Sequence, residues 1–491
     1  MTNIKTSKYL IDKIVSDADS GKMYIAIGSH NGISSNTINY SYNIIEDVKS
    51  KCIFGKKIKS SDISPVIKNN IWVSNTVYET SDDHVADDFF YILNQNNDVF
   101  KCIWNADGAP STSEPLTKST SYIETADSYI WKYMYTISSG DMSKFAFTGF
   151  IPVSSNSVVS NAAINESIDY IEVVQGGSNY SVYNTGIIQG NVGGNTYRIE
   201  NSASAVNNIY ANSAIYIKNG TSTGLLKTVS SSFSNSTGKY ITFSTNTSLS
   251  TDSEYIISPS VILTSLSGSG FQAYAEVTEN DSIDKIKIIN GGSNYVNPEV
   301  SLVTSATVAP AQLRVITSPE YGHGYDPVEE LGATRVVLAA TFLKNENETL
   351  PETNFSYYHT SLIYNPNTNI SEQNTISWGT SLDVNSIFGV NDKIIGNTSG
   401  AKGIVYWSNT SHIKLNTIVG SFSNNETIIN QTGVNSTINI IKDKDIVDFS
   451  GALLQYTIHL DGVNRSDNVS ESIKYIFKLE GNWWQTKLIQ I

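Results

Sequence analysis

Two short stretches of the chain carry residues whose types and spacing could support chemistry. The first is Asp82-Asp83-His84, followed by Asp87 and Asp88. Carboxylate oxygens at this density could bind a hard cation such as Ca²⁺. The residues follow one another directly, however, instead of at the spacing of a ligand loop, and they stand in a turn-rich stretch. A solvated acidic loop is therefore the better interpretation.

The second stretch covers residues 321–332, where His323 stands between two glycines and is followed by Asp326. A histidine near an aspartate could suggest an acid–base pair. The order of residues favours a structural role instead. Asp326-Pro327 is typical of a helix N-cap followed by the first helical residue, and the two glutamates after it suit the positive end of a helix. Gly332 would end that helix.

No catalytic, cofactor or metal motif is present elsewhere. The chain contains no nucleophile elbow, zinc-protease, phosphate-loop, dinucleotide or EF-hand pattern. The two cysteines, Cys52 and Cys102, form neither a CxxC pair nor a cluster with histidine, so two buried thiols in a reducing compartment are expected. We expect no catalytic residue, no cofactor and no metal, and hence a protein that is not an enzyme.

Charge and composition narrow the function classes further. The formal net charge is −14, which disfavours nucleic-acid binding. No apolar run is long enough to span a membrane, and the N-terminus lacks the features of a signal peptide, so a soluble protein made in a cytoplasm is expected. Only 16% of the residues are charged, and abundant Asn, Ser, Thr, Ile, Val and Tyr predict strands joined by many turns.

Helical periodicity is confined to the first part of the chain. Leu10, Ile11, Ile14 and Val15 form a stripe that predicts a helix ending near Gly21. A strand at residues 23–28 and a second helix at residues 44–52 are expected after it. Short strands then alternate with turns up to residue 153, and residues 154–160 resemble a linker.

Two internal repeats follow. Ser167-Ile168-Asp169-Tyr170-Ile171 leads to a Gly-Gly-Ser-Asn-Tyr segment at residue 176, and a second copy reaches the same segment at residue 291 (291 − 176 = 115). Each copy predicts a strand that ends in a Gly-Gly turn, and then a tyrosine that folds back onto the sheet. At a constant offset of 34 residues (422 − 388 = 34), Phe388, Asp392 and Ile394 are matched by Phe422, Glu426 and Ile428, which predicts paired hairpins in a small barrel or sandwich.

An ordered series of motifs resembles one known family. Residues 72–78 (WVSNTVY), 90–92 (FYI), 99–105 (VFKCIWN), 111–115 (STSEP), 126–135 (ADSYIWKYMY) and 150–153 (FIPV) occur in one order, and residues 322–332, 451–456 and 465–467 extend the series. The series resembles the dimer-forming baseplate wedge subunit of T-even-like contractile-tailed phages, in its marine branch. The resemblance covers about half of the chain. The turn at residues 29–32 and the residues before Arg465 depart from the family pattern.

The resemblance implies a mainly β protein of several β-sandwich or small barrel domains, with a few helices at the N-terminus and near residues 326–332. It implies a homodimer in the virion tail baseplate, assembled in the host cytoplasm. Its expected partners are other wedge proteins and tail-fibre or adhesin attachment proteins, with neither nucleic acid nor a membrane span. The expected work is to bridge the wedge core to the periphery and to support contraction signalling.

These expectations define five segments and seven candidate interface residues. The segments are a wedge-family domain (1–153), a β module with the paired GGSNY strands and an insertion at about 191–262 (154–316), a wedge-family core segment (317–374), an inserted hairpin repeat (375–444) and a wedge-family C-terminal strand and tail (445–491). The candidate interface residues are Trp72, Tyr78, Trp131, Tyr133, His323, Tyr325 and Arg465. Many of them could instead be core. A receptor- or glycan-binding tail protein that uses the inserted β domains is the alternative, and a tail-associated depolymerase is a third class.

Overall fold

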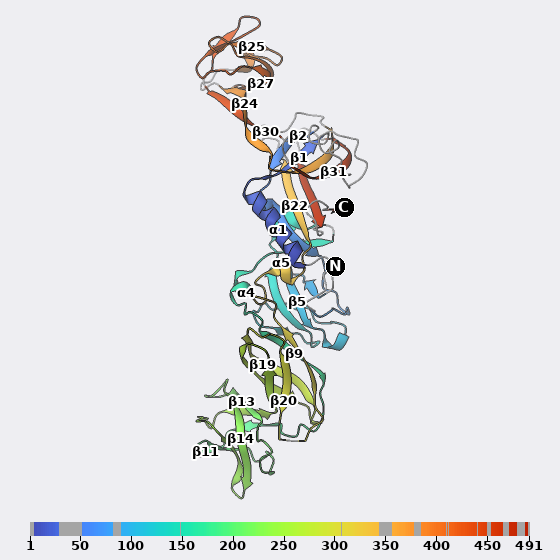
Figure 1. The fold of residues 1–491 in the computed structure, drawn as a ribbon, viewed down its shortest axis with the longest axis vertical. Helices are drawn as coiled ribbons and strands as arrows, with labels where there is room; N and C mark the ends of the chain where they lie inside the picture. Colours follow the sequence, from blue (N-terminus) through green and yellow to red (C-terminus); the bar gives the residue numbers. More distant parts are fainter. Residues whose placement is uncertain are drawn as a thin grey trace. The chain divides into compact units, whose positions relative to one another are not determined.

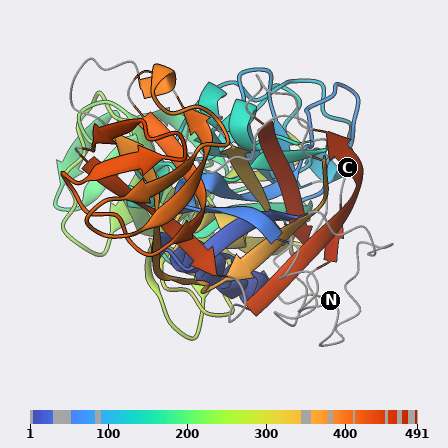
Figure 2. The same cartoon turned by 90° about the horizontal axis from the view of Figure 1, so that it is seen from above.

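The computed structural model describes residues 4–28, 52–81, 90–147, 149–305, 307–342, 356–377, 384–408, 410, 412–438, 440–448, 453–464, 471–478 and 487–489. Strands dominate the fold, and the described helices are few (Figure 1 and Figure 2). The predicted fold class, mainly β with several sheets, is confirmed. The chain divides into two compact units: unit 1 contains residues 1–8 and 64–335, and unit 2 contains residues 9–63 and 336–491.

The N-terminal helix and strand follow the predicted pattern. Helix α1 (Ile4–Asp19) buries Leu10 and Ile11 and ends before Gly21, whose φ of 74° suits a glycine. Strand β1 (Met23–Gly28) lies in a sheet of unit 2 in the order β2-β1-β23-β31. Its partners are β2 (Cys52–Lys57), β23 (Ser356–Tyr364) and β31 (Leu453–Asn464). Of the second predicted helix only Cys52 is described, and Cys52 begins a strand.

An aromatic sheet forms the first part of unit 1. Its order is β4-β5-β7-β6, from strands β4 (Tyr91–Leu93), β5 (Asp98–Trp104), β7 (Ile130–Thr136) and β6 (Ile123–Glu124). β5 and β7 are buried along almost their whole length, so both faces of this sheet are covered. Other elements of this stretch of the chain are β3 (Ile63–Lys68), which pairs with β8 (Phe150–Pro152), η2 (Ala106–Gly108) and α3 (Ser139–Phe145). The short helix η1 (Ser60–Asp62) directly precedes β3 in the sequence.

The segment predicted as a linker, residues 154–160, connects β8 to β9 (Ile168–Gln175) and contains most of a short helix. Helix α4 (Ser157–Asn161) begins at Asn156, whose side-chain oxygen accepts hydrogen bonds from the N–H groups of Val158 and Val159. Val159 is 2% exposed and packs in the aromatic cluster of the sheet. A capping asparagine and one buried valine thus order a stretch whose composition is otherwise typical of a linker.

The GGSNY repeats build one β domain, which we call the carrier (residues 163–180 and 260–318). Strand β9 (Ile168–Gln175) pairs with β21 (Gln312–Thr317), and a second sheet has the order β19-β18-β17-β20. The strands of that sheet are β17 (Ser260–Thr264), β18 (Ser269–Val277), β19 (Ile283–Ser293) and β20 (Glu299–Val303). Both repeat tyrosines, Tyr180 and Tyr295, are buried in the same hydrophobic core, as predicted.

The two copies exchange strands about a pseudo-two-fold axis. β9 and β19 are equivalent, as are β17 and β20, and β18 and β21. The third strand of each copy pairs with the first strand of the other copy, and the register shifts recur: β18 shifts after Gln272 and Glu276, and β21 shifts after Gln312 and Ile316. Between β17 and β20, Ile262 lies opposite Ser301, with Ser260–Val303 and Thr264–Glu299 symmetric about them. The duplication therefore extends well beyond the recognisable sequence repeat.

Residues 182–258, between Tyr180 and β17, contain a seven-stranded sheet and are here called the head. Its order is β10-β16-β13-β14-β15-β12-β11. The strands are β10 (Asn184–Ile187), β11 (Gly190–Gly193), β12 (Thr196–Ile199), β13 (Ala214–Asn219), β14 (Leu226–Asn235), β15 (Gly238–Phe243) and β16 (Glu254–Ser258). The predicted insertion at about 191–262 overlaps this sheet.

A second seven-stranded sheet, in unit 2, contains the other repeat. Its order is β29-β28-β25-β26-β27-β24-β30, and η3 (Val384–Ser386) packs beside it. The strands are β24 (Asn367–Ser377), β25 (Lys393–Gly396), β26 (Lys402–Ser408), β27 (His412–Val419), β28 (Thr427–Asn430), β29 (Asn435–Thr437) and β30 (Ile440–Asp448). Hairpins β25–β26 and β28–β29 match the predicted paired hairpins. The remaining strands are β22 (Arg335–Phe342), β32 (Glu471–Lys478) and β33 (Lys487–Ile489).

Candidate functional site

The motif residues of unit 1 meet in an aromatic cluster on the sheet β4-β5-β7-β6. Tyr78, Tyr129 and Trp131 are each at most 1% exposed. The rings of Tyr129 and Trp131 stack at a centroid distance of 5.5 Å, and Tyr78 meets Trp131 edge-on at 5.6 Å. Such pairs stabilise a core beyond the area that they bury. Phe100 and Tyr133 form a further ring pair at 5.5 Å.

Hydrogen bonds fix the irregular segment 71–78 against this cluster. The Val73 N–H donates to the Tyr78 hydroxyl (2.7 Å), and the indole N–H of Trp72 donates to Ser111 Oγ (3.2 Å). The Asp127 carboxylate accepts from that same serine hydroxyl (2.9 Å) and from the N–H groups of Thr112 (2.7 Å) and Ser113 (2.9 Å). Burial alone would raise the pKa of Asp127, but these hydrogen bonds lower it.

The segment 321–332 is a tight turn followed by helix α5 (Pro327–Glu330). Asp326 caps the helix by accepting from the N–H groups of Val328 and Glu329, both at 3.1 Å, as predicted. Gly322 and Gly324 have φ angles of 96° and 73°, which a residue with a Cβ rarely adopts. A Cβ at Gly322 would also overlap the backbone of Ile164. The two glycines therefore let the turn approach its neighbours closely.

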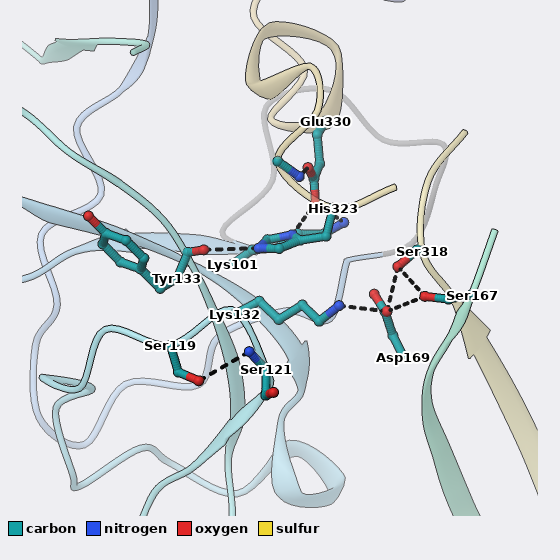
Figure 3. A network of polar contacts seen from close by, with 11 residues as sticks. Lys101, Ser119, Ser121, Lys132, Tyr133, Ser167, Asp169, Ser318, His323 and Glu330 are labelled. Carbon is teal, nitrogen blue, oxygen red and sulfur yellow. Dashed lines mark hydrogen bonds and ion pairs between the residues drawn. The ribbon is translucent and has the colours of Figure 1, made fainter. Parts of the chain in front are cut away.

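The side chain of His323 points from this turn into a buried ionic triad (Figure 3). Its Nδ1 lies 2.8 Å from Glu330 Oε1, and its Nε2 lies 2.9 Å from the carbonyl oxygen of Tyr133. Lys101 Nζ lies 3.1 Å from the same Glu330 oxygen, and the Gly324 N–H donates to the other one (2.6 Å). Because a carbonyl oxygen only accepts, Nε2–H donates to Tyr133, and Nδ1 faces the Glu330 carboxylate.

Electrostatics keep the Glu330 carboxylate ionised. Burial would raise its pKa, but the ammonium of Lys101 and the imidazole of His323 outweigh burial and hold the pKa well below the usual range. The side chains of Lys101 and Glu330 are 5% and 2% exposed, so solvent screens the pair little. Sequence analysis assigned Glu330 to the positive end of a helix; the structure instead makes it the shared acceptor of the triad.

A second buried ion pair joins the aromatic sheet to the carrier. Lys132 on β7 lies 2.6 Å from the Asp169 carboxylate on β9 (Figure 3). Ser318 donates to the same Asp169 oxygen at 2.5 Å, and Ser167 lies 3.1 Å from Ser318. At the edge of the same junction Glu124 contacts Lys285 and Lys287.

These residues form a structural network whose polar groups bond to one another. Both Glu330 oxygens and Asp169 Oδ1 accept from donors within the protein. Among the described residues no group of three or more His, Cys, Asp or Glu side chains could hold a metal ion. The Cys102 thiol is buried, and burial raises its pKa, which leaves the thiol unreactive. Burial likewise raises the pKa of Cys52 to about 12.

The structure places the predicted interface residues mostly inside unit 1. Tyr78, Trp131, Tyr133 and His323 are at most 5% exposed. Trp72 is half-buried and Tyr325 is 58% exposed, so these two keep solvent-accessible surface. Arg465 and the acidic stretch Asp82-Asp83-His84, with Asp87 and Asp88, lie outside the described residues. The interface role of all seven residues stays a prediction.

Comparison with protein-family models, with curated proteins and with solved structures found no match. In the part of the chain that the structure describes, no helix combines the length and the apolar character needed to cross a membrane.

Three residues of the network were missed by sequence analysis: Lys101, Lys132 and Asp169. A usable signal exists for the two lysines, because each stands in the middle of an apolar strand, in VFKCIW and IWKYMY. A lysine within such a strand needs a buried counter-charge. The partners Glu330 and Asp169 lie far along the chain, and no local pattern identifies them.

Unit 2 contains a second kind of carboxylate site in its repeat. Glu426 accepts hydrogen bonds from the N–H groups of Ser399 (2.9 Å) and Ser423 (2.6 Å) and from the Ser399 hydroxyl (2.8 Å). Its repeat equivalent Asp392 accepts from Asn430 (3.1 Å) and Gln431 (2.8 Å). Each carboxylate thus bonds to the turn of the other repeat copy.

Proposed function

We propose that the chain is a structural subunit of a contractile-phage tail baseplate wedge, that it works as a homodimer, and that its role is mechanical and not enzymatic. In this role it bridges the wedge core to peripheral baseplate or fibre proteins and supports contraction signalling in the virion tail. The proposal rests first on the ordered series of motifs between residues 72 and 332.

One observation supports it above the others. Motif segments that are far apart in the sequence, 72–78, 99–105, 126–135 and 322–332, converge on one aromatic cluster and one ionic triad. A protein that transmits a mechanical change needs rigid parts, and buried ring pairs together with satisfied buried charges provide rigidity. The use of both Glu330 oxygens and of Asp169 Oδ1 in bonds within the protein also favours a structural role over catalysis.

The exposed part of this region suits a partner. Tyr321 and Tyr325 are each 58% exposed, and their rings lie 5.2 Å apart on the turn that the triad holds. Tyrosines on a rigid element lose little conformational freedom on binding and are enriched at interface hot spots. We place a wedge or dimer contact here.

Light scattering of the purified chain at two salt concentrations tests the dimer. We expect a particle of twice 53.7 kDa at both concentrations. The double variant Tyr321→Ser, Tyr325→Ser should yield monomers, or should lose binding to co-expressed wedge partners, whereas Tyr9→Ser is the matched control on another exposed tyrosine. A stable trimer would favour a fibre or adhesin.

The alternative function is that of a receptor- or glycan-binding tail protein. The head supports this alternative because it has a hydrophobic core of its own. Fourteen buried residues form that core, all from residues 182–257. Binding of glycans by the full chain, lost on substitution of exposed head residues, would support this second function. A glycan array with the purified chain is the direct measurement.

A further inference from the structure

The second repeat copy carries no inserted domain at the position where the head is inserted in the first copy. In the second copy the chain runs from Tyr295 to β20 through residues 296–298 alone. In the first copy the equivalent connection, from Tyr180 to β17, contains the whole head. The carrier strands on both sides keep the same pairing and the same register shifts in the two copies. A complete carrier half therefore forms with a connection of three residues.

The head and the carrier also have separate hydrophobic cores. The head core runs from Val182 to Ile257 in the sequence, and the carrier core draws its buried members from residues 168–180 and 273–295. No residue belongs to both. The change occurs within two residues, because Val182 packs in the head and Tyr183 packs against the carrier core. A domain that has its own core can fold alone.

One ring pair and several hydrogen bonds join the two parts. Tyr216 of the head stacks on Tyr274 of the carrier at a centroid distance of 4.7 Å. The Ala275 N–H donates to Ser258 Oγ at 3.2 Å. The hydroxyls of Ser260 and Ser305 donate to backbone oxygens of the head, those of Asn212 and Ile209 respectively. An interface of this kind orients two domains without making either depend on the other for stability.

We propose that residues 182–258 are an independently folding head, attached to a duplicated carrier that is complete without it. The head can then be lost or exchanged while the carrier keeps its fold and its junction with the aromatic sheet. Any recognition function within the head would be separable from the assembly function of unit 1. This inference does not depend on the proposed baseplate function.

Two point variants of the full chain test the independence by hydrogen exchange. Ile257→Ala opens a cavity in the head core, and Ile286→Ala does so in the carrier core; both residues are at most 3% exposed. We expect Ile257→Ala to speed exchange in β12–β16 by about thirtyfold or more while β9 and β19 are unchanged, since large-to-small core changes cost at least about 2 kcal/mol. Ile286→Ala should produce the reverse pattern. Equal acceleration in both parts by either variant would overturn the proposal.

A deletion keeps the test decisive. In the full chain, residues 181–259 are replaced by Val-Asn-Pro, the connection of the second copy. We expect wild-type protection of β9, β18, β19 and β21, and one fewer thermal transition. Deletion of the head leaves the Tyr274 ring without Tyr216, on which it stacks. A second variant therefore combines the deletion with Tyr274→Ser to remove this newly exposed ring, and we expect the same protection. Loss of protection in β9 and β19 in both variants would show that the carrier needs the head.

Discussion

Lys101 and Lys132 lie directly opposite one another across β5 and β7, yet their ammonium groups bind different carboxylates, Glu330 and Asp169. Like charges that face one another in a sheet are destabilising, and burial increases the cost. Here each charge is neutralised by a residue from a distant part of the chain, one from the turn at residues 321–332 and one from the carrier. The lysine pair therefore acts as the point at which three segments of unit 1 are joined.

A double-mutant cycle on the carrier side of this pair should show strong coupling. Lys132→Met and Asp169→Leu are each expected to destabilise unit 1 by about 3–5 kcal/mol, because each leaves one buried charge unpaired. The double variant should cost much less than the sum of the two, because no charge remains. Urea unfolding followed by tryptophan fluorescence measures all four proteins. Additive effects would mean that the pair does not interact in solution.

The Glu330 carboxylate predicts a pH dependence with a definite sign. Its folded pKa lies below the unfolded value of about 4.3. Between the two values the unfolded state binds more protons, so stability rises with pH there. The contribution is present above pH about 4.3 and is lost as the pH falls toward the folded value. Denaturant midpoints of wild type measured from pH 6 down to pH 3 should decrease.

Glu330→Gln isolates that contribution. The variant should be less stable than wild type at pH 6 by about 3–5 kcal/mol, because the buried Lys101 ammonium loses its counter-charge, and its stability should vary less with pH in the acidic range. Glu329→Gln, the neighbour on the same helix, is the control and should keep the wild-type slope. If Glu329→Gln removed the slope instead, the triad would not be its source.

Glycine positions in the repeat turns give a matched test of the pseudo-two-fold axis. A Cβ at Gly176 would overlap the carbonyl oxygen of Ile283, and a Cβ at Gly291 would overlap that of Ile168, the equivalent residue. We expect Gly176→Ala and Gly291→Ala to destabilise the carrier by similar amounts, about 1–3 kcal/mol each. Gly190→Ala, where a Cβ meets nothing within 4 Å, should cost little. Thermal unfolding compares the three; a large effect only at Gly190 would contradict the reciprocal packing.

Unit 2 allows a comparison between its two equivalent carboxylates. Burial would raise the pKa of Glu426, but hydrogen bonds from Ser399 and Ser423 lower it. Glu426→Gln replaces one acceptor oxygen by an amide donor that faces other donors, at a cost of about 1–3 kcal/mol. Asp392→Asn should cost less, because two of its donors are side-chain amides that can reorient. Hydrogen exchange in β25 and β28 measures both, and the opposite order would be evidence against the assigned bonds.

The fold could be predicted from the sequence where the signal is local. Periodic apolar residues identify α1, and Asp326-Pro327 with Gly332 identifies α5. The GGSNY segments likewise predict two strand–turn units with buried tyrosines. These features depend on neighbours within a few residues. Propensity and capping rules apply at that distance.

The pairing of those units could not be predicted in the same way. β9 pairs with β21 and not with the strands nearest to it in sequence, and β17 and β18 carry no recognisable repeat of β20 and β21. The strand exchange between the two copies can be recognised only from the pairing and register of the strands in the structure. Likewise, the partners of Lys101 and Lys132 are set by the tertiary fold. Aromatic residues taken as candidate contacts, such as Tyr78 and Trp131, proved to be buried because the sheet is covered on both faces.

The exchanged pairing has a consequence for synthesis of the chain. β9 leaves the ribosome first, but its partner β21 follows only after the head and most of the carrier have been made. The head, whose core is complete at Ile257, can fold while β9 is still unpaired. Contacts of such long sequence separation form slowly and leave strand edges open in the meantime. We therefore expect the nascent carrier to be prone to aggregation and to depend on chaperones until β21 has been made.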